Sequence, residues 1–209
     1  ETDFAVDSSG FSTTTYDRWF DHKYGRVRSE AKWIKTHLMC GVKTHVVTSV
    51  EATPTETADA PQLPALLNAT AETFPIYEVS ADKAYSSRKN LRAIEAVGGV
   101  AYIPFKNRTP GIGNTYDALW QRMWHYYNFN RAEFLVHYHK RSNVETTFSM
   151  IKAKFSGAVR SKTPVAQVNE VLCKVLAHNL CVLIQSIYEL GIAPTFWADS
   201  PVAHKVDAI

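Results

Sequence analysis

The sequence predicts an α/β fold, with a mixed sheet flanked by helices. Three observations support this class. Short apolar segments rich in β-branched residues occupy the first quarter of the chain, strand-like and helix-like segments alternate over residues 63–105, and helical periodicity dominates residues 116–190. Strands that alternate with helices imply parallel pairing and helices on the sheet faces. A length of 209 residues favours a single domain.

The N-terminal part of the chain predicts three strands in a meander. Residues 4–7 form a short apolar segment that ends in an acid, and the turn-prone residues 8–10 follow it. Residues 31–42 and 45–51 are rich in β-branched and apolar side chains, and Gly41 marks a turn or bulge between them. We therefore expect Asp7 at the C-terminal end of the first strand.

Helices and strands alternate in the middle of the chain. After a proline-rich loop they are predicted over residues 63–74 (helix), 76–81 (strand), 88–97 (helix) and 100–105 (strand). Ser86 or Ser87 is suited to cap the second helix, and Gly98 with Gly99 to end it. The first strand of this group leads directly into Asp82.

The C-terminal half is predicted to be helical. Residues 107–115 form a glycine-containing loop, and the helical pattern then runs from 116 to about 156 with a break near 128–130. Pro164 is suited to the first turn of a last long helix. The stretch 171–193 is the most apolar, but polar residues interrupt it, which indicates a buried amphipathic helix and not a membrane span. The whole order of elements is compatible with a ribonuclease H-like sheet.

Composition excludes several classes of protein. The chain is 45% hydrophobic and 21% charged, values typical of globular domains and not of disordered, collagen-like or coiled-coil chains. Its three cysteines have no metal-ligand spacing, which predicts buried thiols in a reducing compartment. The first three residues form neither a basic nor an apolar region, so no signal peptide is expected. Because the chain starts at Glu1 and not at a Met, we expect a fragment of a longer protein, cut just before the first strand.

Charge is distributed unevenly along the chain. Residues 51–82 contain six acids and no Lys or Arg, whereas residues 138–162 contain six bases and one acid, Glu145. The simplest interpretation of the acidic stretch, apart from Asp82, is a solvated surface. A single acid inside a basic segment requires a more specific explanation.

A polar stripe runs along the predicted helix that contains Glu145. At about 100° per residue, one arc of about 60° holds four polar side chains, Tyr138, Arg141, Glu145 and Lys152. An apolar arc adjoins it, so Glu145 is expected where the helix meets the sheet. A solvated face with an ordinary Arg141–Glu145 ion pair explains the same spacing equally well.

Two more acids are predicted to lie near Glu145. Asp7 and Asp82 each follow an apolar strand, and ligands bind at the carboxyl ends of strands in open α/β sheets. Clustered carboxylates repel one another unless a cation lies between them. Oxygen ligands alone favour Mg²⁺ or Mn²⁺ over Zn²⁺, and two such ions about 4 Å apart can catalyse phosphodiester displacement. Aspartates that only cap turns are the alternative for each position.

The spacing of the polar stripe resembles a known family signature. Tyr138, Arg141, Glu145 and Lys152 match the Tyr-Arg-Glu-Lys signature of bacterial and archaeal insertion-sequence transposases of the DDE type. The similarity extends to the segments around the acids, 7–10 and 81–85, and residues 32–37 resemble the family's second strand. It covers residues 4 to about 191.

This resemblance implies a ribonuclease H-like catalytic core over residues 1–209. Asp7 would bridge two divalent ions, and Asp82 and Glu145 would each complete one of the two metal sites. The implied reaction is hydrolysis at transposon ends, followed by attack of the freed 3′-hydroxyl on target DNA. The implied DNA-binding residues are Tyr138, Arg141, Lys152, Lys154 and Arg160.

The resemblance also sets expectations about partners and organisation. The partners would be transposon-end DNA, target DNA and a second copy of the chain on DNA, with no membrane, in the cytoplasm and nucleoid of a prokaryote. The 62 residues between Asp82 and Glu145 are too few for the large β insertion of bigger family members, so we expect a compact core. The family's N-terminal DNA-binding segment is expected to be absent.

Three questions stay open at the level of sequence. A metal-dependent nuclease of the same fold, or a non-catalytic DNA-binding remnant of a transposase, would carry similar motifs. The aromatic residues of segment 120–129 suit either core packing or stacking on an unpaired base. His137 and His139 lie two residues apart on a helix and point in different directions. They are therefore not expected to bind one metal ion together.

Overall fold

The computed structural model describes residues 1–13, 23–25, 33–106, 117–191 and 193. Its five-stranded sheet has the order β3-β2-β1-β4-β5. The strands are β1 (Asp3–Ser12), β2 (Trp33–Gly41), β3 (Val47–Pro54), β4 (Glu78–Ala81) and β5 (Val100–Tyr102). The first three form an antiparallel meander, and β4 and β5 run parallel to β1. The predicted mixed α/β sheet is confirmed. Residues 31, 32 and the predicted loop 107–115 lie outside the described part.

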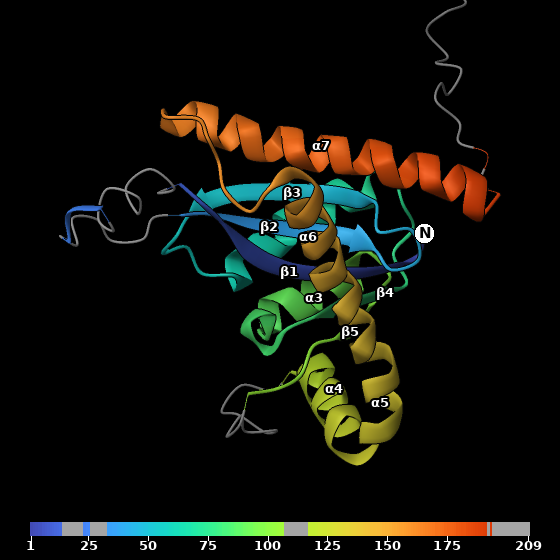
Figure 1. Ribbon diagram of the computed structural model, residues 1–209. Coiled ribbons are helices and arrows are strands. Elements are labelled where there is room, and N and C mark those ends of the chain that lie inside the picture. Colours follow the sequence, from blue (N-terminus) through green and yellow to red (C-terminus); the bar gives the residue numbers. More distant parts are fainter. Residues whose placement is uncertain (14–22, 26–32, 107–116, 192, 194–209) are drawn as a thin grey trace, which may run out of the picture.

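Helices cover both faces of the sheet (Figure 1). One face packs against α2 (Leu63–Ala71) and α3 (Arg88–Ala96), and the other against α6 (Ser142–Phe155) and α7 (Pro164–Glu189). Helices α4 (Ala118–Phe129) and α5 (Arg131–Tyr138) form a hairpin that extends below the sheet in Figure 1. Three single-turn 3₁₀ helices complete the order: η1 (Ala60–Gln62), η2 (Lys83–Tyr85) and η3 (His139–Arg141).

Strand β1 lies at the centre of the sheet and contributes side chains to the hydrophobic cores on both of its faces. Phe4 and Val6 are buried on the α2–α3 side, whereas Ala5 and Phe11 are buried on the α6–α7 side. This alternation is the period of two that a strand requires. It places Asp7 on the α6 side, because Asp7 lies two residues after Ala5.

The predicted turn at residues 8–10 is wrong, because β1 continues to Ser12. Pairing with β2 extends it: Ser8 lies opposite His37, and Gly10 lies opposite Lys35. A Cβ at Gly10 would lie 2.7 Å from the Trp33 ring, so glycine permits the close approach of this indole. A neighbouring strand therefore overrides the local turn signal of Ser-Ser-Gly.

The helical hairpin confirms the predicted break near residues 128–130. Helix α4 ends at Phe129, and Asn130 separates it from α5. No strand occurs among the described residues between β5 and α6, as expected for a core without a β insertion. Trp120 is buried, and Phe134 contacts the rings of three tyrosines, Tyr102, Tyr126 and Tyr127. Most of the aromatic segment therefore serves core packing.

Removal of the Phe134 ring is expected to destabilise the domain. Phe134 is completely buried, and a Phe→Ala cavity costs about 3–5 kcal/mol. We expect Phe134→Ala to lower the free energy of unfolding by about this amount in urea melts. The matched control is Phe129→Ala in the same hairpin, where the side chain is 75% exposed and the expected change is below about 0.5 kcal/mol. Equal effects of the two changes would contradict the packing.

Helix α7 begins as predicted and packs along β3 and α6. The Thr163 hydroxyl accepts the Ala166 N–H, and Pro164 occupies the first turn. Val171, Val175 and Val182 are buried beneath the helix. By length and mean hydropathy this helix is one that could span a membrane. The expectation of a buried helix is correct only for the face toward the sheet.

Two of the buried polar side chains of α7, Lys174 and His178, bond to backbone carbonyls of other segments. Lys174 donates to the carbonyl oxygens of residues 156 and 158. His178 Nε2 lies 3.0 Å from the His45 carbonyl oxygen, to which it donates. These bonds connect α7 to the segment between α6 and α7 and to the turn between β2 and β3.

Candidate active site

Asp7 and Asp82 lie at the same level of two adjacent parallel strands. Val6 pairs with Ala81, the last residue of β4, so the two acids directly follow paired residues. Asp7 is not at a strand end, contrary to prediction, but it lies where its neighbour β4 stops. The Asp82 carboxylate accepts the Lys83 N–H at 2.6 Å and caps η2. The turn-capping alternative thus holds for Asp82, alongside its position beside Asp7.

Arg141 connects the first acid to Glu145. Its Nη1 donates to Asp7 Oδ2 at 2.6 Å, and its Nη2 donates to Glu145 Oε1. The Arg141–Glu145 ion pair therefore exists, but it is not a solvated helix pair alone, because the same guanidinium reaches the central strand. The polar stripe borders the sheet as the sequence predicts. Glu145 is 54% exposed at its side chain and stays open to a ligand.

The electrostatics of Asp7 reflect all three acids. Burial raises the pKa of the Asp7 carboxyl above its ordinary value, and the charges of Asp82 and Glu145 raise it further. The Ser8 N–H and the Arg141 guanidinium oppose this effect without cancelling it. Asp7 is thus a carboxylate whose charge the fold does not fully compensate.

The donor chemistry of the site suits a hard divalent cation, but the side-chain positions are not those of ligands on one ion. Carboxylate oxygens are the donors that Mg²⁺ and Mn²⁺ prefer. Within the described part of the chain, no three His, Cys, Asp or Glu side chains are close enough together to hold a metal. The Arg141 guanidinium supplies the positive charge between Asp7 and Glu145. The metal-binding role of the acids therefore stays a prediction.

The predicted DNA-binding residues divide into two groups. Tyr138 ends α5, Arg141 lies in η3 and Lys152 lies in α6, so the signature spans a 3₁₀ turn and not one uninterrupted α-helix. Lys152 Nζ donates to Ser9 Oγ at 2.6 Å, and burial lowers the pKa of Lys152. Arg141 and Lys152 thus both reach β1 beside Asp7.

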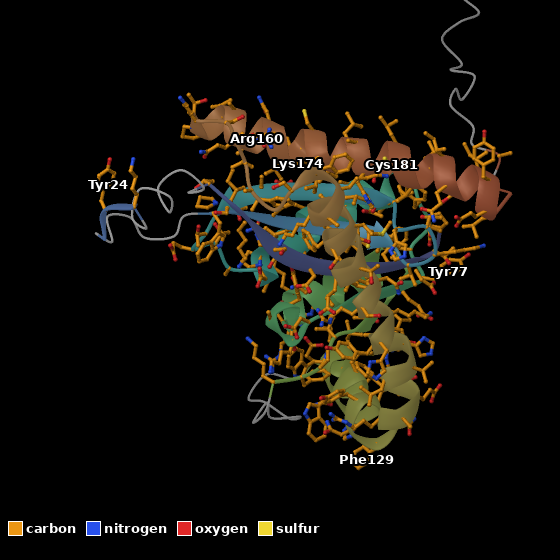
Figure 2. The ribbon with its side chains drawn as sticks, viewed as in Figure 1. Tyr24, Tyr77, Phe129, Arg160, Lys174 and Cys181 are labelled. Carbon is orange, nitrogen blue, oxygen red and sulfur yellow. The ribbon has the colours of Figure 1, made fainter. Side chains whose placement is uncertain are left out.

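The remaining two cations lie away from the acids. Lys154 is exposed on α6. Arg160 lies in the connection to α7 (Figure 2), and its backbone N–H donates to the Glu170 carboxylate. No contact of either side chain with Asp7, Asp82 or Glu145 is present.

Asp59 is a neighbour of the site that the sequence does not predict. It belongs to the acidic stretch interpreted as a solvated surface, but its carboxylate accepts Ser8 Oγ at 2.8 Å and pairs with Lys35 Nζ at 2.8 Å. Ser8 directly follows Asp7, so Asp59 holds the strand from the opposite face. The two partners are 51 residues apart in the sequence, and no local signal links them.

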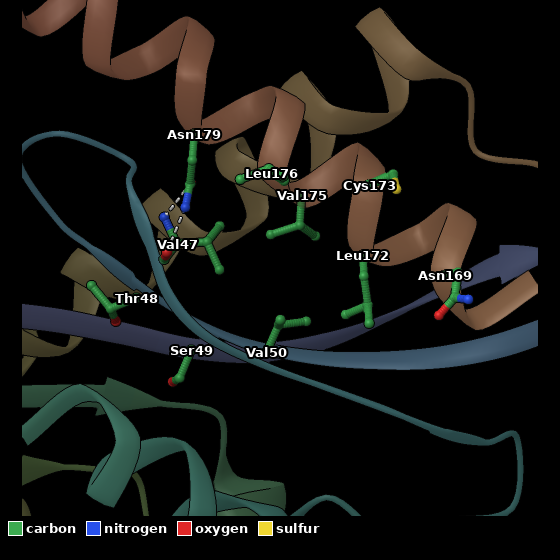
Figure 3. Close-up of a pocket in the computed structure, with 10 residues that line it drawn as sticks. All are labelled: Val47, Thr48, Ser49, Val50, Asn169, Leu172, Cys173, Val175, Leu176 and Asn179. Atoms are coloured by element: carbon green, nitrogen blue, oxygen red, sulfur yellow. Dashed lines mark hydrogen bonds between the residues drawn. The ribbon is translucent and has the colours of Figure 1, made fainter. Parts of the chain in front are cut away.

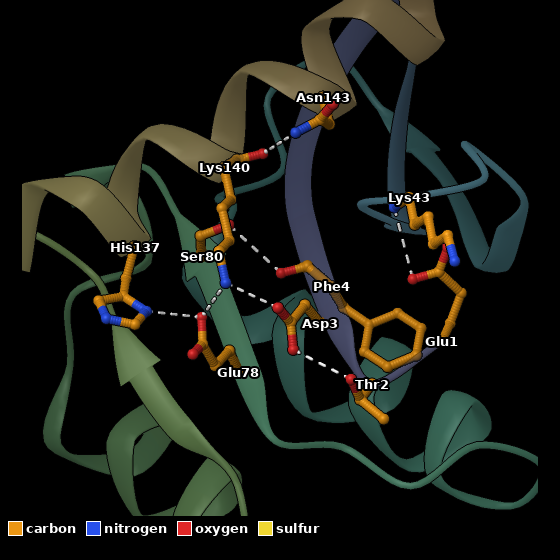
Figure 4. Close-up of polar contacts among 10 residues, drawn as sticks. All are labelled: Glu1, Thr2, Asp3, Phe4, Lys43, Glu78, Ser80, His137, Lys140 and Asn143. Carbon is orange, nitrogen blue, oxygen red and sulfur yellow. Dashed lines mark hydrogen bonds and ion pairs between the residues drawn. The ribbon is translucent and has the colours of Figure 1, made fainter.

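A second ion-pair cluster fixes the segment that carries Arg141 (Figure 4). Lys140 Nζ lies 2.7 Å from both Asp3 Oδ2 and Glu78 Oε2, and His137 Nδ1 lies 2.9 Å from the same Glu78 oxygen. His137 also stacks on Tyr102, with ring centroids 4.4 Å apart. Glu78 is therefore another member of the acidic stretch that is not simply solvated. The cluster attaches α5 and η3 to the first residues of β1 and β4.

Comparisons with known proteins bear on the family and the fold of this chain. The family model described as "Transposase DDE domain" matches residues 1–180. No curated protein matches the chain. A solved structure, the cryo-EM structure of the piggyBac transposase synaptic complex with hairpin DNA, is similar in fold, with a TM-score of 0.54 at 10% identity. That match covers 93% of this chain and 49% of the other, so this chain spans about half the length of its structural neighbour.

The family model covers most of the chain, and the structural neighbour shares the ribonuclease H-like arrangement of the sheet. The matched range contains Asp7, Asp82, Glu145 and the Arg141 that joins two of these acids. The chain therefore belongs to the DDE transposase family and contains that family's catalytic-domain fold.

Proposed function

We propose that this chain is the catalytic domain of a DNA transposase, which hydrolyses phosphodiester bonds at transposon ends and joins the freed ends to target DNA. The observation that supports this is that Arg141 joins Asp7 on β1 to Glu145 on α6, while Asp82 follows the adjacent parallel strand at the level of Asp7, in a chain of the DDE transposase family. Glu145 is 54% exposed at its side chain, so a DNA strand can reach this carboxylate.

The three acids would hold Mg²⁺ or Mn²⁺, with Asp7 shared between two ions. Bound metal would activate the attacking water or 3′-hydroxyl and stabilise the leaving oxygen. The raised pKa of Asp7 supports this assignment, because a partly uncompensated carboxylate gains most from a nearby cation. The chain's own contribution is to fix Asp7 in the central strand and to present Glu145 from α6.

Arg141, Lys152 and Tyr138 would bind the phosphates beside the scissile bond. A guanidinium suits bidentate phosphate contact, and an ammonium supplies a point charge. Arg141 already lies between two of the acids, and Lys152 contacts Ser9 two residues from Asp7. Lys154 and Arg160 would add sequence-independent attraction to the DNA backbone, which weakens as the salt concentration rises.

The proposed partners are transposon-end DNA, target DNA and a second copy of the chain. Transposition joins two ends in one event, so two catalytic domains on DNA are the natural unit. The neighbouring piggyBac transposase was solved as a synaptic complex with hairpin DNA. The proposed location is the cytoplasm, on the nucleoid of a prokaryote.

The test is nicking of supercoiled plasmid DNA by the 209-residue chain with Mn²⁺ or Mg²⁺. We expect metal-dependent nicking, and its loss in Asp82→Asn. Glu51→Gln, which changes an exposed acid on β3, is the control and should nick normally. Equal nicking by the Asp82→Asn protein would contradict the carboxylate site.

Two further outcomes separate the alternative functions. Nicking without any joining of labelled transposon ends to target DNA would favour a nuclease of the same fold. DNA binding without nicking at any metal concentration would favour a non-catalytic DNA-binding protein. Both assays use the same protein preparation and differ only in the DNA supplied.

A further inference from the structure

The outer face of α7 is apolar and exposed. Leu176 is 62% exposed and Leu180 56% exposed. The face comprises Val165, Asn169, Leu172, Cys173, Leu176, Leu180, Ile184 and Tyr188, and none is charged. We call these residues the α7 outer face. It runs almost the full 26-residue length of the helix, or about 39 Å.

This face is unusual because the opposite side of α7 already packs on the sheet. A surface helix normally has one apolar stripe and one charged face, but α7 is apolar on both sides. Val171, Val175 and Val182 account for the buried stripe. A helix with two apolar sides is typically covered on both.

The exposed apolar side chains form a row and not isolated positions. Six of them, on the α7 outer face, are between 37% and 85% exposed, whereas apolar side chains on the surface of a monomer are normally scattered singly. The fully buried centre of a protein interface is similarly apolar and poor in charge. This face can therefore supply the apolar centre of a contact.

An apolar groove adjoins the α7 outer face (Figure 3). It lies between α7 and β3, has a volume of about 550 Å³, and is lined by Leu172, Leu176 and Val50 among others. At one end the Asn179 side chain bonds both the N–H and the carbonyl of Val47. This occupies the edge of β3 there, so the groove offers apolar side-chain contacts. Large side chains from a facing helix fit such a groove.

We propose that the α7 outer face binds the same face of a second copy of this chain, and that it does so without DNA. A two-fold dimer brings one surface patch against the same patch of the second copy. If the patch carried charges of one sign, like charges would face one another and repel. The absence of charge on this face removes that repulsion. The rows of residues four apart, such as Leu172, Leu176 and Leu180, are the ridges that pack between two helices.

DNA is excluded as the occupant because the face has no cation to bind phosphate. The proposal goes beyond a dimer assembled on DNA, since it locates the interface and does not require substrate. It is also independent of catalysis: a chain that fails to nick DNA could still dimerise through α7, and the reverse. The nicking assay therefore tests catalysis alone, and the mass measurement tests the dimer alone.

The test is the solution mass of the 209-residue chain by light scattering and sedimentation without DNA. We expect a dimer of 47 kDa, twice the 23.5 kDa chain mass. The double change Leu176→Glu with Leu180→Glu places charges at the contact and should raise the dimer Kd at least about 100-fold. The control is Phe129→Glu with Val136→Glu, two exposed apolar residues of the α4–α5 hairpin, which should leave the dimer intact.

Several results would overturn the proposal. These are a monomeric chain at about 50 µM, a dimer that survives the α7 changes, or a dimer lost only in the hairpin control. A monomer that dimerises once residues 192–209 are deleted would assign the face to the chain's own C-terminal segment. A monomer that sediments with phosphatidylcholine vesicles would assign the face to lipid. Ile184→Lys is a single change on the α7 outer face and should also weaken the dimer. Unfolding melts of each variant show whether a lost dimer reflects loss of the contact or loss of the fold.

Discussion

Glu145→Gln is expected to slow DNA strand cleavage by at least about 10³-fold and to leave DNA affinity within about twofold. Glutamine keeps the size of the side chain and an oxygen that can accept from Arg141, but it loses the negative charge. The proposed metal site depends on that charge. The phosphate contacts depend on Arg141 and Lys152, which the substitution leaves in place.

Cleavage of an end-labelled duplex and a gel shift on the same duplex, in parallel, measure the two quantities. Glu72→Gln is the matched control: it removes one carboxylate from an exposed position after α2 and should change neither. If Glu145→Gln weakens binding as much as it slows cleavage, Glu145 binds the DNA or orients Arg141, and is not a metal ligand.

Asp7→Asn is expected to abolish cleavage while it raises the thermal stability of the protein. The pKa of Asp7 is raised in the folded state, so at neutral pH folding leaves an ionised carboxylate in an unfavourable place. Asparagine resembles the protonated acid and does not carry this cost. A stabilised but inactive variant is the behaviour of a residue retained for function at the expense of stability.

The pH dependence gives the sign of this effect. Below the pKa of the unfolded carboxyl both states of the wild-type protein bind the proton, and Asp7→Asn should have little advantage. As pH rises toward the elevated folded pKa, the wild-type protein loses stability that the variant cannot lose. Melting temperatures of both proteins from about pH 3 to 8 should therefore diverge as pH increases. A variant less stable than wild type at neutral pH would indicate that the ion pair with Arg141 outweighs burial.

The sequence alone determined features that depend on nearby residues. Ser87, one of the two predicted caps, accepts the Asn90 N–H, and Pro164 occupies the first turn of α7 as predicted. The alternation of strands and helices determined the parallel placement of β4 and β5. A helix cap or a strand period is decided within a few residues, so these features can be predicted from a short window.

The candidate site is a mixed case. The spacing of Tyr138, Arg141, Glu145 and Lys152 predicted a stripe at the edge of the buried face. The positions of Asp7 and Asp82 after apolar strands, and then the family resemblance, predicted the other two acids. What the spacing did not decide is that Arg141 reaches Asp7, 134 residues earlier in the chain. That contact exists because α6 crosses β1 and because the Lys140 cluster holds η3 against the sheet.

Only the tertiary structure decided which polar residues are partners and which apolar residues stay exposed. Pairing with β2 turned a predicted Ser-Ser-Gly turn into strand, and the order of the sheet brought Asp59 to Ser8 and Glu78 to Lys140. Helix periodicity predicts the apolar sides of α7, but only its packing on the sheet determines which side is buried. Contacts between distant segments depend on the sheet order and on helix placement, which no short window of sequence contains.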